Sequence, residues 1–119
     1  MIQGKIWGTT EPLLVTPLIE IHRIRAKPNS HCSWHAHHFK WNCFIVTSGE
    51  LFIEARKLDY ELVDTTRLMA GDSTTVPPRE YHRFVSGTEG AVAYEVYYPE
   101  PLGPDIERED HGGVIPSKE

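Results

Sequence analysis

The sequence predicts a single all-β domain of the sandwich or barrel type. Short runs rich in β-branched and aromatic residues follow one another along the 119 residues, and turns containing glycine or proline separate them. No segment of ten or more residues shows a helical period, and the chain contains no internal repeat. We therefore expect one domain over residues 1–119, with a core from about residue 15 to residue 98 and an irregular tail over residues 99–119.

The first expected strand covers residues 18–25, where isoleucines roughly alternate with polar residues. Residues 4–12, which contain glycine and proline, are expected to form an irregular lead-in. Residues 42–47 form a second β-type run. Ser48 and Gly49 predict a turn after it, so residues 51–54 should return as a hairpin partner.

The second half of the chain continues the same pattern of short strands. A turn is expected at residues 70–72 and another at residues 87–90, because both contain glycine. Further strands are expected at residues 60–63, 73–76, 82–85 and 91–98.

Composition and charge exclude several classes of protein. The net charge of −5 gives no electrostatic support for a nucleic-acid partner. No apolar run approaches the roughly 20 residues that cross a bilayer, and the first residues lack the apolar segment of a signal peptide. We therefore expect a cytoplasmic protein without a membrane partner. Cys32 and Cys43 fit neither a metal-binding pair nor a disulfide framework, and both are expected to be free thiols.

Histidines are concentrated at residues 31–38, which contain four of the seven in the chain. His35 and His37 are two positions apart, so on a strand they would lie on one face, about 6–7 Å apart at the backbone. Two imidazoles in this arrangement can bind one cation. His31 has the same parity and is expected nearer the mouth of the site. A histidine-rich surface loop is the alternative interpretation.

These histidines belong to a stretch that resembles the first motif of the cupins, which is Gly, five residues, His-x-His, three or four residues, Glu, six residues and Gly. In this chain His35, His37 and Gly49 match that motif. Asn29 takes the place of the first glycine, and Asn42 takes the place of the glutamate.

A second stretch resembles the second cupin motif, which is Gly, five residues, Pro-x-Gly, two residues, His, three residues and Asn. Gly71, Pro77 and His82 match it, whereas Arg79 and Ser86 replace the second glycine and the asparagine. The two motifs occur in the expected order and spacing. The resemblance implies a cupin-type double-stranded β-helix, also called a jelly-roll barrel.

The resemblance also implies a divalent metal ion held by His35, His37 and His82, with Asn42 at the position of the usual glutamate ligand. A carboxylate ligand favours Mn²⁺ or Fe²⁺, whereas an amide oxygen is neutral and a weaker donor. Three imidazoles still suit zinc, iron, nickel or copper, so the identity of the metal (Mn, Fe, Zn or Ni) stays open. A cupin that has lost its metal is the alternative.

Weaker similarities extend over most of the chain. Lys40 and residues 48–51, 94–99 and 105–110 look like those of small sugar-isomerase cupins, the mannose-6-phosphate isomerase-like proteins and the D-lyxose isomerases. The resemblance implies an aldose–ketose isomerase acting on a sugar or sugar phosphate. A divalent metal would polarise the substrate oxygens while a carboxylate base moves a proton between two carbons.

Two residues are candidates for catalysis. Strand alternation places Glu95 on one face with small residues, as suits a substrate-filled lumen, so Glu95 is the expected base. Lys40 lies close to the histidines in sequence and is expected to steady a developing oxyanion or a substrate phosphate. The alternatives are an outward-facing glutamate and a solvated loop lysine.

Two other functions remain open. The chain could be a non-catalytic cupin that binds a small sugar or acid, or an iron dioxygenase in which three histidines alone hold Fe²⁺. The resemblance to cupins further implies a homodimer. Trp7 and the segment near Leu18 are the expected contributors to its interface.

Overall fold

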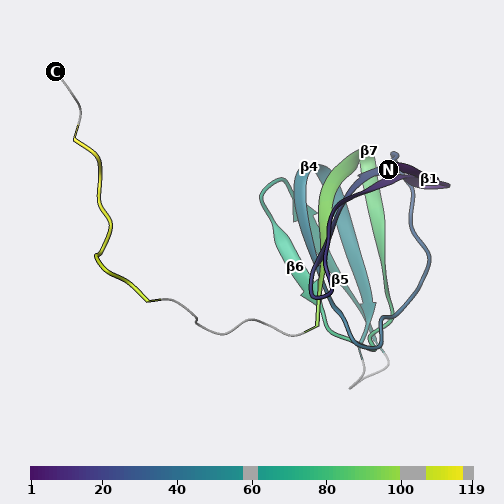
Figure 1. Ribbon diagram of the computed structural model, residues 1–119. Helices are drawn as coiled ribbons and strands as arrows, with labels where there is room; N and C mark the ends of the chain where they lie inside the picture. The colour runs from purple at the N-terminus through teal and green to yellow at the C-terminus, as the bar shows by residue number, and fades with distance from the viewer. Residues whose placement is uncertain (58–61, 100–106, 117–119) are drawn as a thin grey trace.

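Every regular element in the described residues of the computed structural model, which are 1–57, 62–99 and 107–116, is a β-strand. The strands are β1 (Gln3–Lys5), β2 (Gly8–Val15), β3 (Glu20–Ala26), β4 (Trp41–Arg56), β5 (Val63–Met69), β6 (Ser73–Val76) and β7 (His82–Tyr98). They pair antiparallel in the order β1-β2-β3-β7-β4-β5, and β6 also pairs with β4 (Figure 1). The all-β prediction is confirmed. Within these residues no helix is long and apolar enough to cross a membrane.

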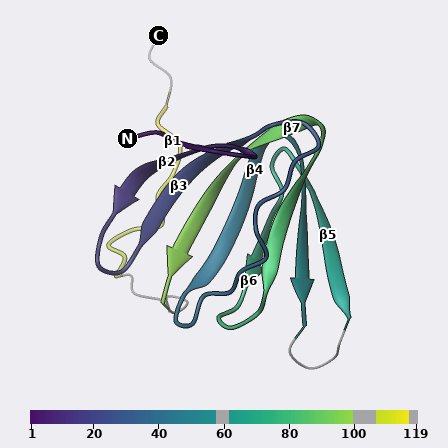
Figure 2. The same ribbon diagram turned by 90° about the vertical axis from the view of Figure 1, so that its right-hand side faces the viewer.

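Strands β4 and β7 run through both layers of the barrel. The first half of β4 lies between β6 and the second half of β7, and its second half lies between β5 and the first half of β7. Figure 2 shows the result, with β1, β2 and β3 on one side, β5 on the other, and β4 and β7 between them. Each of the two long strands therefore contributes residues to both walls of the interior.

The hairpin turn predicted at Ser48 and Gly49 is wrong, as is the turn predicted at residues 87–90. Both stretches are bends within continuous strands, and the register of β4 shifts on either side of Gly49. Gly49 has a φ of 78°, and a Cβ there would overlap the carbonyl oxygen of Gly90. Glycine at this position lets the backbones of the paired strands β4 and β7 approach closely where they bend. From the sequence alone, the same glycine predicted a reversal of the chain.

The interior is filled by alternate residues of the long strands. Asn42, Phe44 and Val46 are each only 1% exposed, which confirms the predicted inward face of β4. The face of β7 that carries Glu95 is buried as well. The apolar core consists of Ile24, Ala26, Cys32, Phe44, Val46, Leu51, Ile53, Leu68, Val76, Phe84, Ala91 and Ala93.

The N-terminal residues differ from the expected irregular lead-in, because the sheet already begins at Gln3 in β1. Strand β2 contains Pro12, a residue that usually marks the edge or the irregularities of a sheet. Pro12 pairs with His22 of β3 beside a register shift. Pairing with β3 thus keeps residues 8–15 in a strand, although the proline predicted irregular chain. The sheet therefore starts upstream of the expected core boundary near residue 15.

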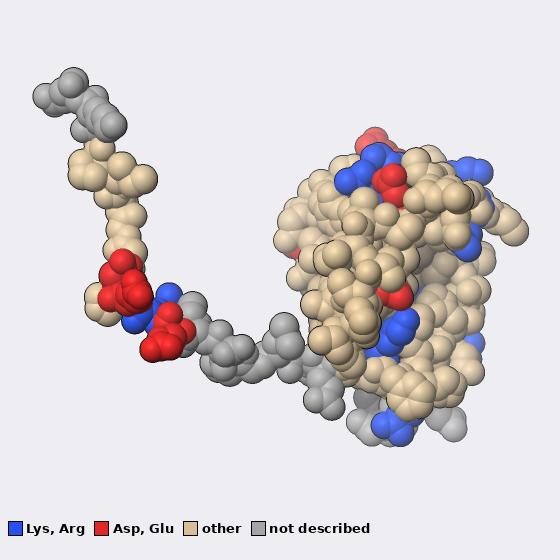
Figure 3. All heavy atoms as spheres, in the orientation of Figure 1, with Lys and Arg blue, Asp and Glu red and all other residues tan. Residues whose placement is uncertain are grey.

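Two further predictions fall partly outside the described residues. Of the strand predicted at residues 60–63, positions 60 and 61 are not described, and the observed β5 begins at Val63. Residues 107–116 of the expected irregular tail form no strand and are exposed. Figure 3 shows that this segment carries a cluster of acidic side chains, and they belong to Glu107, Glu109 and Asp110.

Candidate metal centre

The histidine pair lies in the segment between β3 and β4, residues 27–40, outside the named strands. The prediction that His35 and His37 lie on a regular strand is therefore wrong. The segment contains Pro28 and Asn29, whose φ is 51°, and backbone hydrogen bonds join it to β7 at Asn29, Ser30, Cys32 and His35. An isolated bridge joins His35 to His82. It places the histidine-rich segment beside the second motif.

Three histidine rings converge inside the barrel, as the two motifs predicted. One ring nitrogen from each of His35, His37 and His82 lies within 4.8 Å of the other two. The ring centroids are 5.1 Å apart for His35 and His37, 4.6 Å for His35 and His82, and 5.5 Å for His37 and His82. Three ring nitrogens at this spacing can coordinate a single cation.

Hydrogen bonds to backbone carbonyls orient two of the rings. Nδ1 of His35 donates to the carbonyl of Ser33 at 2.8 Å, and Nδ1 of His82 donates to the carbonyl of Glu80 at 3.0 Å. Each bond fixes the tautomer in which Nε2 keeps its lone pair, as in the supporting shell of metal sites. In the third ring, Nε2 of His37 is buried and has no hydrogen-bond partner among the described residues.

Burial keeps two of these histidines neutral. Burial, together with the nearby charges of His35 and His82, lowers the pKa of His37 to about 4. Burial also lowers the pKa of His82, against an opposing hydrogen bond to the Glu80 carbonyl. Neutral imidazoles at pH 7 are the form that binds a metal.

Asn42 lies inside the barrel beside His82, as its position in the first motif predicted. It is 1% exposed, and its Nδ2 lies 3.4 Å from Nε2 of His82. Its Oδ1 is buried without a hydrogen-bond partner among the described residues. Buried polar atoms rarely stay unpaired, and a cation held by the three rings would satisfy the free nitrogen of His37. The residues present therefore fit a divalent metal held mainly by nitrogen donors.

Glu95 faces the same interior and is 8% exposed. Its carboxylate accepts a hydrogen bond from the hydroxyl of Tyr97 and a further one from the side chain of Asn42. Burial raises the pKa of Glu95, whereas the Tyr97 hydrogen bond and the charges of His35 and His22 oppose that rise. Burial and the nearby Glu95 charge raise the pKa of Tyr97, so the Tyr97 hydroxyl stays a donor.

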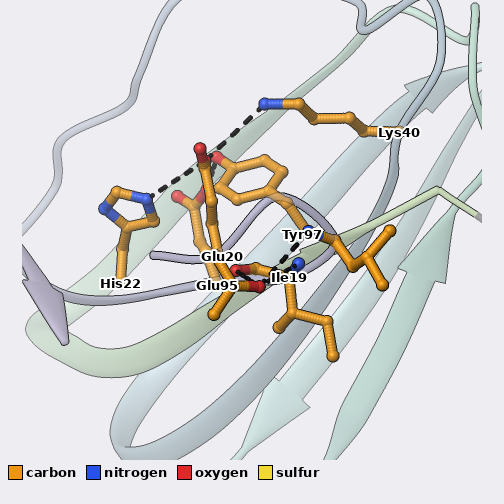
Figure 4. Close-up of polar contacts among 8 residues, drawn as sticks. Ile19, Glu20, His22, Lys40, Glu95 and Tyr97 are labelled. Carbon is orange, nitrogen blue, oxygen red and sulfur yellow. Dashed lines mark hydrogen bonds and ion pairs between the residues drawn. The ribbon is translucent and has the colours of Figure 1, made fainter. Parts of the chain in front are cut away.

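Lys40 lies at the rim of this site and forms an ion pair. Its Nζ is 3.6 Å from a carboxylate oxygen of Glu20 and 5.6 Å from the centroid of the Tyr97 ring. The same Glu20 carboxylate lies 3.5 Å from Nε2 of His22. Figure 4 shows Glu20 between His22 and Lys40, with Tyr97 and Glu95 beside them. The ammonium group is thus near the predicted base, but its charge is engaged by Glu20.

A cavity of about 860 Å³ adjoins the site. His35, Glu95 and Tyr97 line it, together with residues of β1 and β2 and residues 29–33. His31 is exposed and also lines the cavity, as expected for a residue near the mouth.

Sequence reasoning gave no role to Tyr97, Glu20 or His22. Strand alternation had placed Tyr97 on the same face as Glu95, and their contact could have been predicted from this pattern. Nothing in the sequence indicated that Glu20 would pair with Lys40, because twenty positions separate them.

No protein-family model matches the sequence, and no curated protein has a matching sequence. Solved structures do match. KdgF from Halomonas sp. superimposes with a TM-score of 0.72 at 16% identity, over 85% of this chain and 87% of that one. The Cnp3 cupin domain of Schizosaccharomyces pombe gives a TM-score of 0.72 at 13% identity, over 84% and 69% of the two chains.

Oxalate decarboxylase from Bacillus subtilis, in a structure described for its Mn(II) centers, gives a TM-score of 0.75 at 15% identity. The match covers 87% of this chain but only 28% of the decarboxylase. At these identities the likeness shows the fold, which is that of the cupins. The predicted jelly-roll barrel is therefore confirmed.

Proposed function

We propose that this chain binds a divalent metal ion through His35, His37 and His82, with the amide oxygen of Asn42 as a further or water-bridged ligand. Three ring nitrogens within 4.8 Å of one another support this proposal, as does the buried Oδ1 of Asn42, which has no hydrogen-bond partner among the described residues. The Mn(II) centers named for the decarboxylase of the same fold are consistent with it. A bound cation would supply Lewis acidity that polarises carbonyl and hydroxyl oxygens.

We further propose that the reaction is an aldose–ketose isomerisation of a small sugar or sugar phosphate. One observation carries this proposal: the buried carboxyl group of Glu95 lies in the same interior as the three histidines and lines the cavity beside His35. A carboxylate in this position can take a proton from one carbon of a substrate and return it to the next. The cavity volume of about 860 Å³ accommodates a molecule of that size.

The neighbours of Glu95 would assist this proton transfer. Tyr97 donates a hydrogen bond to the carboxylate and so fixes its orientation toward the cavity. Lys40 would steady the negative charge that develops on a substrate oxygen, or a substrate phosphate, after leaving its ion pair with Glu20. Glu20 would in that case set how readily the lysine becomes free.

Proton exchange in deuterated water tests the proposal. The purified protein is first analysed for bound metals by mass spectrometry and loaded with Mn²⁺, Fe²⁺, Zn²⁺ or Ni²⁺. We expect deuterium to enter aldoses or their phosphates at the carbon next to the carbonyl, and Glu95→Gln to lose at least about 100-fold in this rate. Metal content of the variant is the control. Unchanged exchange in Glu95→Gln would show that another group moves the proton.

A second candidate function is an iron-dependent dioxygenase. The observation that favours it is the donor set, because the metal-holding group in the described residues consists of histidines without a carboxylate. Oxygen consumption by the Fe²⁺-loaded protein with small organic acids or sugars would select this function over isomerisation. Saturable sugar or acid binding without exchange or oxygen consumption would identify a non-catalytic binding protein.

We also propose that two copies of the chain associate. The first eighteen residues expose several large apolar side chains, among them Ile2, Ile6, Val15 and Leu18 at 60%, 97%, 61% and 68%. Figure 3 shows uncharged side chains over most of the barrel face in view. Trp7 differs from its expected role, since it packs against the core and lines the cavity. Sedimentation of the protein as a 13.6 kDa species at micromolar concentration would contradict a dimer.

A further inference from the structure

The outer face of the barrel carries a group of aromatic and arginine side chains behind the histidine rings. Two guanidinium groups lie against the ring of Trp34, with Cζ of Arg56 at 4.5 Å and Cζ of Arg83 at 4.9 Å from its centroid. The guanidinium of Arg56 also lies 5.7 Å from the ring of Tyr81. We call these four residues the outer clamp. Stacked cation–π contacts of this kind hold side chains in defined positions.

The outer clamp is anchored to two strands of the sheet. Nε of Arg83 donates to Oε1 of Glu54 at 2.8 Å, which joins β7 to β4 on the outer face. The backbone N–H of Arg56 donates to the carbonyl of Tyr81 at 2.8 Å, at the end of β4. Arg83 and Arg56 are thus held in position by contacts that do not involve Trp34.

The outer clamp is directly connected to two candidate metal ligands. Trp34 precedes His35 in the chain, and Tyr81 and Arg83 flank His82. Neighbouring residues of extended chain point to opposite faces, so the clamp holds from outside the two segments whose histidines meet inside. The backbones of His35 and His82 are joined by two hydrogen bonds of 3.0 and 2.8 Å. The outer clamp therefore adds side-chain contacts between the same two segments that these backbone hydrogen bonds join.

We propose that the outer clamp is a positioning device that sets the separation of His35 and His82 and thereby the affinity for the metal. The proposal rests on the metal site proposed above. Residues 27–40 belong to no named strand, and the backbone hydrogen bonds that join them to β7 end at His35, so Trp34 lies where this pairing stops. Without Trp34, the last bonds of this pairing, between His35 and His82, lose the side-chain contacts that support them from the outer face. Groups that orient ligands in this way contribute about 10–100-fold to metal affinity.

The test compares three single variants with the wild-type protein. Trp34→Leu removes the aromatic ring that contacts Arg56 and Arg83, and Trp34→Phe keeps an aromatic ring at this position. Tyr94→Leu is the matched control, because Tyr94 carries a similar contact with Arg23 at 5.7 Å on the outer face of the other layer. Each metal-free protein is titrated with Co²⁺, whose visible absorption reports both affinity and ligand geometry. Thermal unfolding of the metal-free forms measures their stability separately.

We expect Trp34→Leu to bind Co²⁺ about tenfold more weakly, with shifted absorption bands. Trp34→Phe should recover most of the affinity, and Tyr94→Leu should retain the wild-type affinity and spectrum. Wild-type affinity and spectrum in Trp34→Leu would overturn the proposal, as would an equal loss in Tyr94→Leu. If Trp34→Leu does not fold, Arg56→Gln takes its place, with an expected loss of about threefold.

The wild-type titration separates this inference from the proposed function. Absence of Co²⁺ binding by the wild-type protein would refute the metal site itself, and the clamp would then have no site to position. Binding by the wild-type protein with an unaffected Trp34→Leu variant would refute the clamp alone.

Discussion

Strand β7 and the segment of residues 27–40 both carry histidines of the candidate metal centre, but they hold them in different ways. Strand β7 pairs with β4 along most of its length and with β3 along its second half. It carries His82, Glu95 and Tyr97 on its inner face. The segment of residues 27–40 carries His35 and His37, and a few hydrogen bonds to β7 and the contacts of the outer clamp keep it in place.

The difference teaches that one motif supplies a rigid ligand and the other supplies adjustable ligands. Moving His82 requires breaking a ladder that belongs to both layers of the barrel. Moving His35 breaks its two backbone bonds to His82, and moving His37 breaks the bond from the Arg79 N–H to its carbonyl at 2.6 Å, which are fewer bonds than the ladder of β7 contains. Metal binding should therefore depend most on β7, and the predictions below test that ranking.

The largest expected effect is that of His82→Ala on metal affinity. Sharing binding free energies of about 10–16 kcal/mol among three or four donors gives about 4 kcal/mol each, or about a thousandfold in affinity. His37→Ala should lose less, because its segment can readjust and a water can replace the ring. Calorimetric titration with Zn²⁺ measures both. Equal losses in the two variants would show that β7 and the segment hold their ligands equally firmly.

The second effect concerns the rigid region itself. Gly49→Ala forces a Cβ into the Gly90 carbonyl at a position with a φ of 78°. We expect a loss of about 3 kcal/mol in the free energy of unfolding, since strained backbone and steric overlap both contribute. Urea denaturation provides the measurement. Gly4→Ala is the matched control, because nothing lies within 4 Å of a Cβ at Gly4. A similarly small change in unfolding free energy in both variants would argue against a close approach of the β4 and β7 backbones at Gly49.

The third effect sharpens the role of Asn42 on β4. Asn42→Glu introduces the glutamate of the first cupin motif and adds a charged oxygen beside His82. We expect Mn²⁺ to bind about tenfold more tightly, and Cu²⁺ affinity to gain less, because carboxylates favour hard ions. Titration with both metals tests this. Unchanged affinities would place the side chain of residue 42 away from the bound ion.

The smallest effect is a pH dependence of the metal-free protein. His37 has a pKa of about 4 in the folded state, whereas an unfolded histidine titrates near 6.5. Between these values the unfolded state binds more protons, so stability should be complete above about pH 6.5 and decrease as the pH falls toward 4. Melting temperatures measured with a chelator present should fall over this range. In His37→Gln the fall should be smaller, and an identical pH profile would contradict the prediction.

The fold class and the inward residues of the site could be predicted from the sequence. Period-two alternation placed Asn42 and Glu95 inside, and the spacing of the two motifs brought His35, His37 and His82 together. Alternation does not reveal where a strand bends without ending, and so the bends at Gly49 and at residues 87–90 were read as turns. The backbone of the histidine pair was also misjudged, because its contacts with β7 are distant in sequence.

The contacts around Lys40 and Trp34 could not be predicted for a related reason. Glu20 meets Lys40, and Arg56 and Arg83 meet Trp34, only after the two layers close. Such contacts depend on the register between strands, which is set by tertiary pairing and not by local pattern. The motifs located the ligands, but the residues that orient them became visible only in three dimensions.

The sharing of β4 and β7 between the two layers has a consequence for how a ligand enters and leaves. The cavity is lined by residues of β1 and β2 and by residues 29–33, among which Lys5 and His31 are exposed to solvent. A molecule can pass there while the long ladder between β4 and β7 stays intact. Exchange of a ligand with solvent is thus separated from unfolding of the barrel. Residence time can be tuned by side chains that line the cavity, such as Lys5 and His31, without a cost in global stability.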